Sequence, residues 1–330
     1  MAYITLNKKN FFYNLDTIAH KAGSKEKIAL VLKDNAYGHG IVEMATLAKE
    51  YGIKKAVVQL NSEALQIENF FEYILVLADT PTLKTTKIRY TINSLDAITT
   101  FPKETAVELK VNTGMNRNGI EPQELQLAFK MIEKQGLKLE AVFTHHACAD
   151  ELTDMYKHQN IIFENVKKSS PKGVRFHSCN SAALFRSKIF DEDMVRVGIA
   201  AYGCLELPSE ISEVQLKPVL SLYAQKISSR LVTKGTTVGY GASFKADEDV
   251  VISSYDFGYG DGFLRTLSGI FKTVESVKIA GRISMDNSSF LSSKDELLIF
   301  KDARDVSAQI DTISYEVLTS LKASLKRQIV

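Results

Sequence analysis

The 330-residue sequence lacks several features that mark whole classes of protein. It has three cysteines, Cys148, Cys179 and Cys204, and their odd number and irregular spacing argue against a disulfide framework or a metal site. No apolar run approaches a transmembrane span, and the first residues hold no apolar core of signal-peptide length, so we expect a cytoplasmic protein. The formal net charge of +2 is too small to favour nucleic acid or an anionic membrane as a partner.

The motifs of several common enzyme classes are also missing. The sequence contains no HExxH, no Walker lysine loop and no GxGxxG. The stretch GYGDG at 258–262 is rich in glycine, but it lacks the spacing and the strand–turn–helix context of a dinucleotide site. The remaining composition, 45% hydrophobic and 24% charged, is that of an ordinary soluble globular protein. Its length suits two domains, or one barrel with an added module.

Between residue 27 and about residue 200, short β-rich runs alternate with amphipathic stretches, among them 41–51, 122–135 and 153–168. Such alternation is typical of parallel βαβ units. Eight candidate strands favour a compact (β/α)8 barrel of the TIM type, and an open doubly wound sheet is the structural alternative. The candidate strands are 28–33, 56–60, 73–78, 88–92, 106–111, 139–144, 174–178 and 194–197.

The pattern changes after about residue 215. From there on, β-rich runs are separated by glycines and polar turns, with little helical periodicity until a short pattern near 311–324. We therefore expect a barrel domain over 1–215 and a mostly β domain over 216–330. Residues 1–10 contain a strand-like segment before the first barrel unit, and we expect them to pair with the C-terminal domain.

A (β/α)8 barrel carries its functional residues at the C-terminal ends of its strands. Lys33 closes the first apolar run in the stretch VLKDNAYGHG (31–40), at such a position. An ordinary turn is the alternative for this lysine taken alone. The other strand ends, however, carry basic or hydrogen-bonding groups as well: Lys110, Arg117, His145, His177, Asn180, Ser181, Arg196 and Gly198.

These groups give the expected mouth many cations and few carboxylates, so its ligand should be anionic. Small residues and main-chain N–H groups in 180–183 (NSAA) and 196–203 (RVGIAAYG) follow the last two strands, where barrels of this kind bind phosphate. A desolvated lysine among other cations has a lowered pKa and can attack an aldehyde. Pyridoxal phosphate, a phosphorylated aldehyde cofactor, would meet both requirements.

Nine motifs, in order along nearly the whole chain, resemble those of the alanine racemase family of barrel-type (fold type III) pyridoxal-phosphate enzymes. They are LKDNAYGHG (32–40), LKVNTGMNRNG (109–119), FTHHACADE (143–151), FHSCNSAA (176–183), MVRVGIAAYG (194–203), VGYGASF (238–244), FGYGDGF (257–263), GRISMD (281–286) and ISYEVLTSL (313–321).

The resemblance implies a homodimeric isomerase that interconverts L- and D-alanine and supplies D-alanine for cell-wall peptidoglycan. Lys33 would bond the cofactor and act as the base on the D-face of the substrate α-carbon, and Tyr259 would be the base on the L-face. Arg117 and Met285 would bind the substrate carboxylate, with Tyr259 and Met285 coming from the partner subunit. Arg196 would contact the pyridine nitrogen. The cofactor-binding residues would be Lys33, Tyr37, His145, Asn180, Ser181, Arg196, Gly198, Ile199 and Tyr315.

Three positions depart from the family pattern. Asp34 follows the lysine where alanine is usual, Asn112 replaces a common aspartate, and His146 stands where an aromatic residue is usual. Lys110 is at the position that the family often carbamylates. The alternatives to alanine are a racemase for another amino acid, such as serine or lysine, a decarboxylase of the same fold, and a non-catalytic protein that binds pyridoxal phosphate. The last kind lacks the C-terminal β domain expected here.

Overall fold

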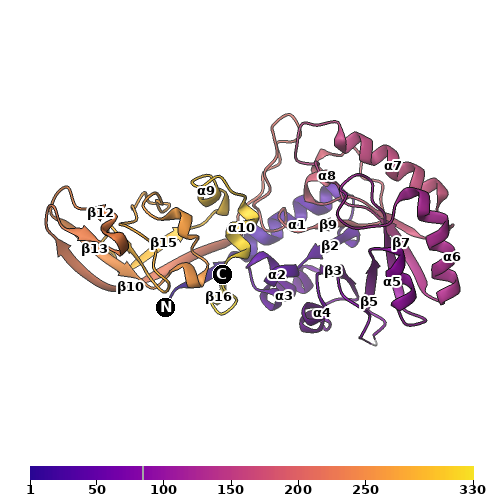
Figure 1. Cartoon of the computed structure of the whole chain (residues 1–330), viewed down its shortest axis with the longest axis horizontal. Helices are drawn as coiled ribbons and strands as arrows, with labels where there is room; N and C mark the ends of the chain where they lie inside the picture. Colours follow the sequence, from indigo (N-terminus) through magenta and orange to yellow (C-terminus); the bar gives the residue numbers. More distant parts are fainter. Residues whose placement is uncertain (84) are drawn as a thin grey trace.

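The computed structural model describes residues 1–83 and 85–330, and it shows an elongated molecule in which a barrel and a mostly β unit lie end to end (Figure 1). Eight parallel strands form the barrel sheet in the order β8-β7-β6-β5-β4-β3-β2-β9. Because this order follows the chain around a ring, the predicted barrel is confirmed and the doubly wound sheet is excluded. The strands are β2 (Ile28–Val31), β3 (Lys55–Val58), β4 (Tyr73–Val76), β5 (Ile88–Ile92), β6 (Ala106–Lys110), β7 (Lys138–Phe143), β8 (Arg175–His177) and β9 (Val195–Val197).

The ring is joined where its first and last strands meet. Strand β9 pairs in parallel with β2. The β8 and β9 segments are linked by main-chain hydrogen bonds from Asp193 N to Phe176 O (3.1 Å) and from Arg196 N to Cys179 O (3.0 Å). All eight strands therefore direct their C-terminal ends toward one end of the barrel.

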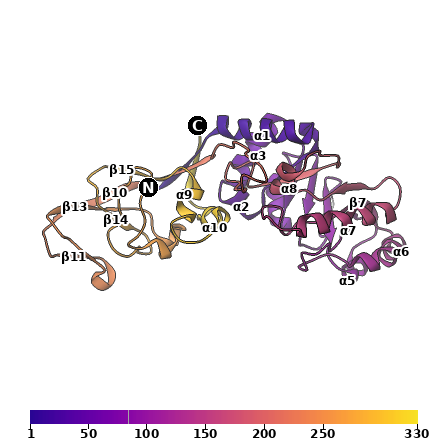
Figure 2. The same ribbon diagram turned by 90° about the horizontal axis from the view of Figure 1, so that it is seen from above.

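Helices cover the outside of the barrel (Figure 2). Helices α3, α6 and α7 correspond to the three predicted amphipathic stretches. Helix α1 was not predicted, although Phe11, Leu15 and Ile18 recur at helical spacing and the Asn7 side chain caps its first turn by accepting from Asn10 N. None of the helices in the described part of the chain combines the length and apolar character needed to span a membrane. The barrel helices are α1 (Lys8–Ala22), α3 (Ile41–Tyr51), α4 (Asn61–Ile67), α5 (Leu95–Thr100), α6 (Leu125–Gln135), α7 (Met155–Ser169) and α8 (Ser181–Arg186), and the segment labelled α2 (Lys33–Tyr37) is a left-handed turn.

The C-terminal unit is mostly β, as the sequence predicted, and is built around the long strand β10 (Leu220–Val232). Strand β10 pairs antiparallel with β1, β13 and β15. The first strand of the chain, β1, thus lies in the C-terminal sheet, with β16 parallel on its other side. The remaining elements are β1 (Tyr3–Leu6), β11 (Thr237–Val238), β12 (Phe244–Lys245), β13 (Val250–Tyr255), β14 (Ser288–Phe290), β15 (Glu296–Phe300), α9 (Ala303–Ser307), α10 (Ser314–Thr319) and β16 (Lys326–Ile329).

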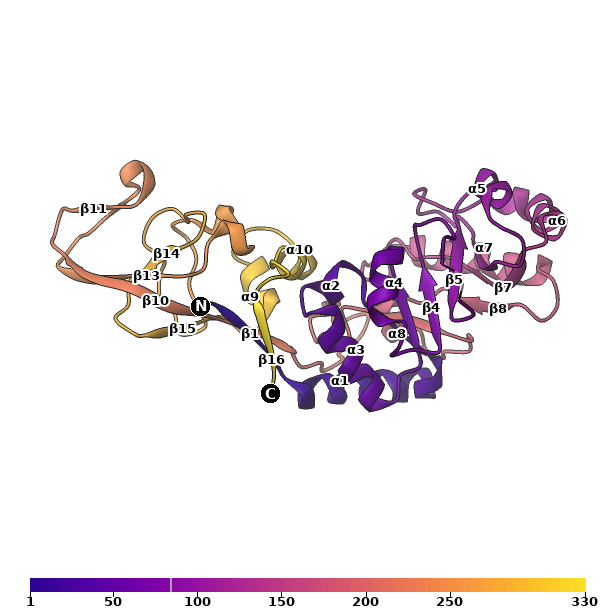
Figure 3. The same cartoon turned by 90° about the horizontal axis from the view of Figure 1, so that it is seen from below.

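The two parts of the molecule share one apolar core, and both chain termini lie near their junction (Figure 3). Strand β1 leads directly into helix α1, so the chain enters the barrel from the C-terminal sheet. The buried side chain of Asn14 on α1 holds the segment that returns to that sheet. Its Nδ2 donates to Ala201 O (3.0 Å) and to Lys217 O (2.8 Å), and its Oδ1 accepts from Lys217 N (2.8 Å). A single side chain thereby satisfies three main-chain groups at the junction.

The C-terminal unit also packs against the turn that follows β2. Gly38 ends this turn with a φ of +75°, and a Cβ atom there would lie 1.9 Å from Leu318 O on α10. Arg327 on β16 donates to Gly38 O from Nε and Nη2, at 3.1 and 2.8 Å. Gly23, which ends α1 with a φ of +79°, has no atom within 4 Å of a Cβ position. Gly38 is therefore required by its conformation and by its neighbour, and Gly23 by its conformation alone.

We expect Gly38→Ala to destabilise the protein more than Gly23→Ala. Both substitutions place a side chain at positive φ, which costs about 1–2 kcal/mol. Only Gly38→Ala also forces a Cβ into a main-chain oxygen, which adds about 1–3 kcal/mol of overpacking strain. Urea unfolding of the two variants and the parent measures this difference. Equal losses of stability in the two variants would show that α10 does not constrain the turn.

Candidate active site

A cavity of about 480 Å³ opens at the C-terminal end of the barrel. It lies where the parallel strands converge, which is the place predicted for functional residues. Every barrel strand supplies a lining residue at its end or shortly after it. In strand order from β2 to β9 these are Lys33, Gln59, Leu77, Asn93, Lys110, His145, Asn180 and Gly198.

The structure brings ten of the twelve predicted site residues together in this cavity: Lys33, Tyr37, Arg117, His145, Asn180, Ser181, Arg196, Gly198, Ile199 and Tyr315. The other two, Tyr259 and Met285, lie on the C-terminal unit and are 41% and 55% exposed. They are neighbours, because Tyr259 N donates to Ser284 O (3.0 Å) and Gly260 N donates to Met285 O (2.8 Å). Neither lines the cavity of its own chain.

The cavity is strongly cationic. Four lining side chains are basic, and none of the described lining residues is an aspartate or a glutamate. Burial, together with the charges of Arg117, Arg196 and Lys33, lowers the pKa of Lys110 to about 8. The arrangement therefore favours an anionic ligand, as the strand-end residues predicted.

A left-handed turn delivers Lys33 and Tyr37 to the cavity. Residues 34–37 have φ values between +50° and +53°, a region that costs a residue with a side chain about 1–2 kcal/mol. Two side chains hold the turn. Asn35 Oδ1 accepts a hydrogen bond from Ile41 N (2.9 Å), and Oε1 of Glu63, on α4, accepts one from Asp34 N (2.6 Å). A run of four positive φ values has no sequence signal beyond the glycines that follow it, and it was not predicted.

The buried side chain of His39 also stabilises this turn. Its Nδ1 donates to Ala36 O (3.1 Å) and to Tyr37 O (3.0 Å), and its ring stacks on Tyr202 with the centroids 4.4 Å apart. Burial lowers the pKa of His39 to about 4, so the ring is neutral. The unusual residue Asp34 is half exposed and lies outside the cavity lining, with its carboxylate 3.6 Å from Lys33 Nζ.

Hydroxyl groups gather at the β8–β9 side of the cavity. Ser181 Oγ accepts from Gly198 N (3.2 Å) and from Ala200 N (3.3 Å). A Cβ on Gly198 would lie 2.8 Å from the hydroxyl of Tyr37, so only glycine lets this tyrosine lie against the loop. Burial raises the pKa of Tyr37 and of Tyr315, which keeps both phenols neutral and able to donate. Neutral hydroxyls and main-chain amides together suit a phosphate group.

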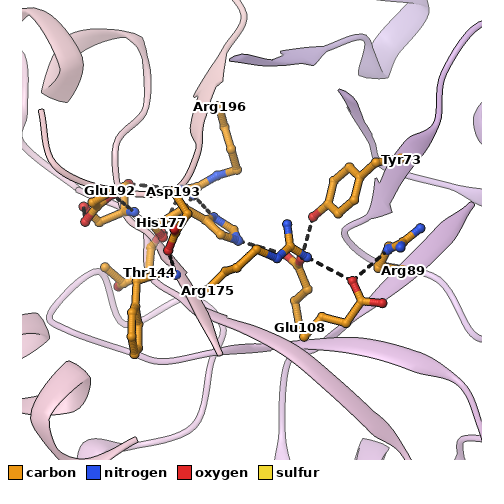
Figure 4. A network of polar contacts seen from close by, with 12 residues as sticks. Tyr73, Arg89, Glu108, Thr144, Arg175, His177, Glu192, Asp193 and Arg196 are labelled. Carbon is orange, nitrogen blue, oxygen red and sulfur yellow. Dashed lines mark hydrogen bonds and ion pairs between the residues drawn. The ribbon is translucent and has the colours of Figure 1, made fainter. Parts of the chain in front are cut away.

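Arg196, on β9, is buried and lines the cavity, and Figure 4 shows its side chain beside His177. Its Nη2 donates to Thr144 O (2.7 Å) and to Ser178 O (3.1 Å), and a longer contact of 3.4 Å reaches His145 Nδ1. Burial and the charge of Arg196 lower the pKa of His145 well below its usual range, so this imidazole is neutral. His177, which the sequence placed at the mouth, is fully buried beneath Arg196 and does not line the cavity.

The departure at Asn112 has a local explanation. Asn112 Oδ1 accepts from Gly114 N (3.1 Å) and Asn116 N (3.0 Å), and its Nδ2 donates to Asn116 Oδ1 and to Glu121 Oε1, both at 2.8 Å. This side chain therefore organises the loop that carries Arg117. An aspartate at 112 would lack the two donors and would face the Glu121 carboxylate.

The departure at His146 is also explained by packing. His146 is buried outside the cavity lining, and its Nε2 lies 3.0 Å from Asn160 Oδ1. Its ring packs on Tyr156 with the centroids 4.8 Å apart. Burial lowers the pKa of His146, so the neutral ring fills the place of an aromatic side chain.

Sequence reasoning missed the side of the cavity formed by β3 to β5. Gln59, Thr91 and Asn93 line it, and Asn118, in the loop after β6, lines the cavity as well. The Thr91 Oγ1 and Asn93 Oδ1 atoms are buried and have no hydrogen-bond partner in the described part of the chain. The rule that found the other residues would have found Gln59 and Asn93, because both lie at the ends of predicted strands.

Comparisons with known proteins agree with this architecture. Family models for the alanine racemase N-terminal and C-terminal domains match residues 6–206 and 219–329. An alanine racemase of a Nitratiruptor species is 45% identical, and the match covers 99% of either chain. The solved alanine racemase of Clostridium difficile 630 has a TM-score of 0.90 at 26% identity, covering 100% of this chain and 95% of that one.

A histidine racemase of Leuconostoc mesenteroides subsp. sake shares the fold, with a TM-score of 0.85 at 24% identity over 100% of this chain and 98% of that one. This likeness concerns the fold alone. The family models, in contrast, match both parts of the chain and nearly all of its length. The chain is an enzyme of the alanine racemase family.

Proposed function

We propose that this enzyme interconverts L- and D-alanine with pyridoxal phosphate held in the barrel cavity, and that it supplies D-alanine for cell-wall peptidoglycan in the cytoplasm. The observation that carries the proposal is the convergence of ten predicted residues on one cationic cavity with no carboxylate in its described lining. The C-terminal unit with Tyr259 and Met285 supports a racemase over a cofactor carrier, because a carrier has no need of a second base.

The residues present fit the cofactor at each of its polar groups. Tyr37, Ser181 and Tyr315, with the loop at 198–199, would hold the phosphate, and Asn180 caps the adjoining helix by accepting from Ala183 N at 2.9 Å. Lys33 would bond the aldehyde carbon. When bound, the cofactor withdraws electrons from the α-carbon of an attached amino acid, so that its proton can be removed.

Arg196 would meet the pyridine nitrogen. Its Nη1 and Nη2 atoms form hydrogen bonds to main-chain oxygens and histidine nitrogens, whereas no described residue accepts a hydrogen bond from its Nε–H. His145 would turn its remaining N–H toward the site, because its Nδ1 faces Arg196.

Inversion of the α-carbon needs a proton acceptor on one face and a proton donor on the other. We assign Lys33 Nζ to the D-face and Tyr259 Oη to the L-face. Arg117, held by the loop that Asn112 organises, would pair with the substrate carboxylate. Because Tyr259 and Met285 do not line the cavity of their own chain, we infer that a partner subunit presents them, and that the enzyme is a homodimer with barrel 1–215 facing the partner's 216–330.

Borohydride treatment of the enzyme loaded with pyridoxal phosphate should leave a pyridoxyl group on Lys33, because reduction fixes the lysine–cofactor bond. Peptide mass spectrometry locates the label. Lys33→Arg should carry none, and the control Lys110→Arg should keep it at Lys33. Label on another lysine would refute the assignment. A racemisation assay with alanine, serine, lysine and histidine then tests the substrate, and a preference for any amino acid other than alanine would refute that part.

Subunits carrying Lys33→Ala and Tyr259→Phe should complement each other when mixed. Each homodimer should lose activity by about 10²-fold or more, because each lacks one acid–base group. In a mixed dimer, one of the two sites combines an intact Lys33 with an intact Tyr259, so about half of the parent activity should return. The measurement is alanine racemisation after co-expression and separation of the mixed dimer. Mixed dimers that remain as inactive as the homodimers would place both residues in one subunit's site.

Lys110 should titrate near pH 8 in the ligand-free enzyme, because burial and the neighbouring cations favour its neutral amine. NMR of reductively ¹³C-methylated lysines measures this titration, with Lys110→Arg identifying the signal. Exposed lysines should titrate about two pH units higher, near 10.4. A Lys110 signal that titrates with the exposed lysines would show that the cavity does not favour the neutral amine, the form that carbamylation requires.

A further inference from the structure

Glu108 has no part in the function proposed above, yet one imidazole joins it to Arg196 (Figure 4). Glu108 lies on β6 and His177 on β8, and both side chains are fully buried inside the barrel. His177 Nε2 is 2.8 Å from Glu108 Oε2, and His177 Nδ1 contacts Arg196 Nη1. A carboxylate, an imidazole and a guanidinium thus form one line from the barrel interior to the cavity lining.

The direction of each hydrogen bond in this line is fixed by chemistry. A guanidinium has donors and no acceptor, so His177 Nδ1 must accept from Arg196 Nη1. The single proton of a neutral imidazole is then on Nε2 and is donated to Glu108. A doubly protonated ring would set two N–H groups against each other at Nδ1. Burial lowers the pKa of His177, which agrees with the neutral ring.

Glu108 is held as a carboxylate by three groups on two other strands, β4 and β8. Its Oε1 accepts from the Tyr73 hydroxyl (2.5 Å) and from Arg175 Nη2 (3.2 Å), while Oε2 faces His177. Burial alone would favour the neutral acid, but these hydrogen bonds and the positive charge of Arg175 outweigh it and lower the pKa of Glu108. Every oxygen of this buried carboxylate therefore has a donor.

The consequence appears at Arg196. His177 contacts Nη1 through both its ring and its carbonyl oxygen, the latter at 3.2 Å. The carbonyl oxygens of Thr144 and Ser178 accept hydrogen bonds from Nη2. With both terminal nitrogens fixed in this way, the planar guanidinium cannot rotate, and its Nε–H is the donor left for a group in the cavity.

We propose that Glu108 is a positioning residue for Arg196. Its carboxylate fixes the Nε2–H tautomer of His177 and increases the electron density at Nδ1, so that the imidazole holds the guanidinium with its Nε–H toward the cavity. The contact of that N–H with a pyridine nitrogen rests on the function proposed above. The tautomer and the orientation of the guanidinium do not, because they follow from the contacts within this chain.

Glu140 offers a matched control. Its Oε2 accepts from the same Arg175 (2.9 Å) and from Arg89 (3.0 Å), but Glu140 does not contact His177. Both Glu108→Gln and Glu140→Gln remove one charge from the same network and keep the side-chain size. Because Glu108 is fully buried and Glu140 is 29% exposed, the variants are compared by the His177 ring signals, which a positioning role changes in Glu108→Gln alone.

The first measurement is histidine ring ¹⁵N NMR of the ligand-free parent enzyme, with His177→Gln identifying the signals. We expect His177 to be neutral and protonated on Nε2 at pH 7. A ring protonated on Nδ1, or on both nitrogens, would overturn the proposal whatever the enzyme binds. This measurement needs no variant of Glu108, so it holds even if that substitution prevents folding.

The second measurement compares the two variants. In Glu108→Gln we expect shifted His177 nitrogen signals and about a tenfold weaker affinity of the ligand-free enzyme for pyridoxal phosphate, as loss of a hydrogen bond to a charged group typically gives. In Glu140→Gln we expect unchanged signals and an affinity within about twofold of the parent. Equal behaviour of the two variants would overturn the proposal. A parent enzyme that does not bind pyridoxal phosphate would instead refute the proposed function, while the His177 signals would still decide the tautomer.

Discussion

The structure depends on a concentration of positive charge around one cavity. Two unit charges 4 Å apart repel by about 4 kcal/mol near a protein surface, so the basic side chains that line this cavity oppose folding until an anion enters. Asp34 lies 3.6 Å from Lys33 Nζ but outside the lining, and Glu108 and Glu192 are buried and do not line the cavity either. Glu108 is bonded to His177, and Glu192 accepts from Ser178 N and Oγ while contacting Lys167 at 3.4 Å. This arrangement offsets the charge of Arg196 without presenting a competing anion to the ligand.

The turn after β2 is strained because it directs Lys33 and Tyr37 into this cavity. Four successive residues at positive φ persist only where the surroundings over-determine the backbone. Here Glu63 holds the turn from the barrel side, and Arg327 and Leu318 hold it from the C-terminal unit. The C-terminal unit therefore positions Lys33 within its own chain, in addition to the part that we propose for it in the partner's site.

The sequence predicted the barrel and most of the cavity because both rest on local signals. Apolar runs located all eight strands, and the strand-end rule located residues such as Lys33 and His145. Glu108 was missed because a charged residue inside a strand is expected to face solvent, and only the closure of the barrel buries it. His177 was placed at the mouth because sequence spacing does not show whether a side chain at a strand end points into the cavity or into the barrel interior.

The three departures from the family pattern share a physical property that bears on function. Asn112 and His146 are each matched by a partner of their own, Glu121 and Asn160, and neither lines the cavity. Asp34 is half exposed outside the lining. The chain therefore varies the supports behind the cavity and keeps the groups that face it. Since a bound ligand meets only the facing groups, these departures give no reason to assign a different chemistry.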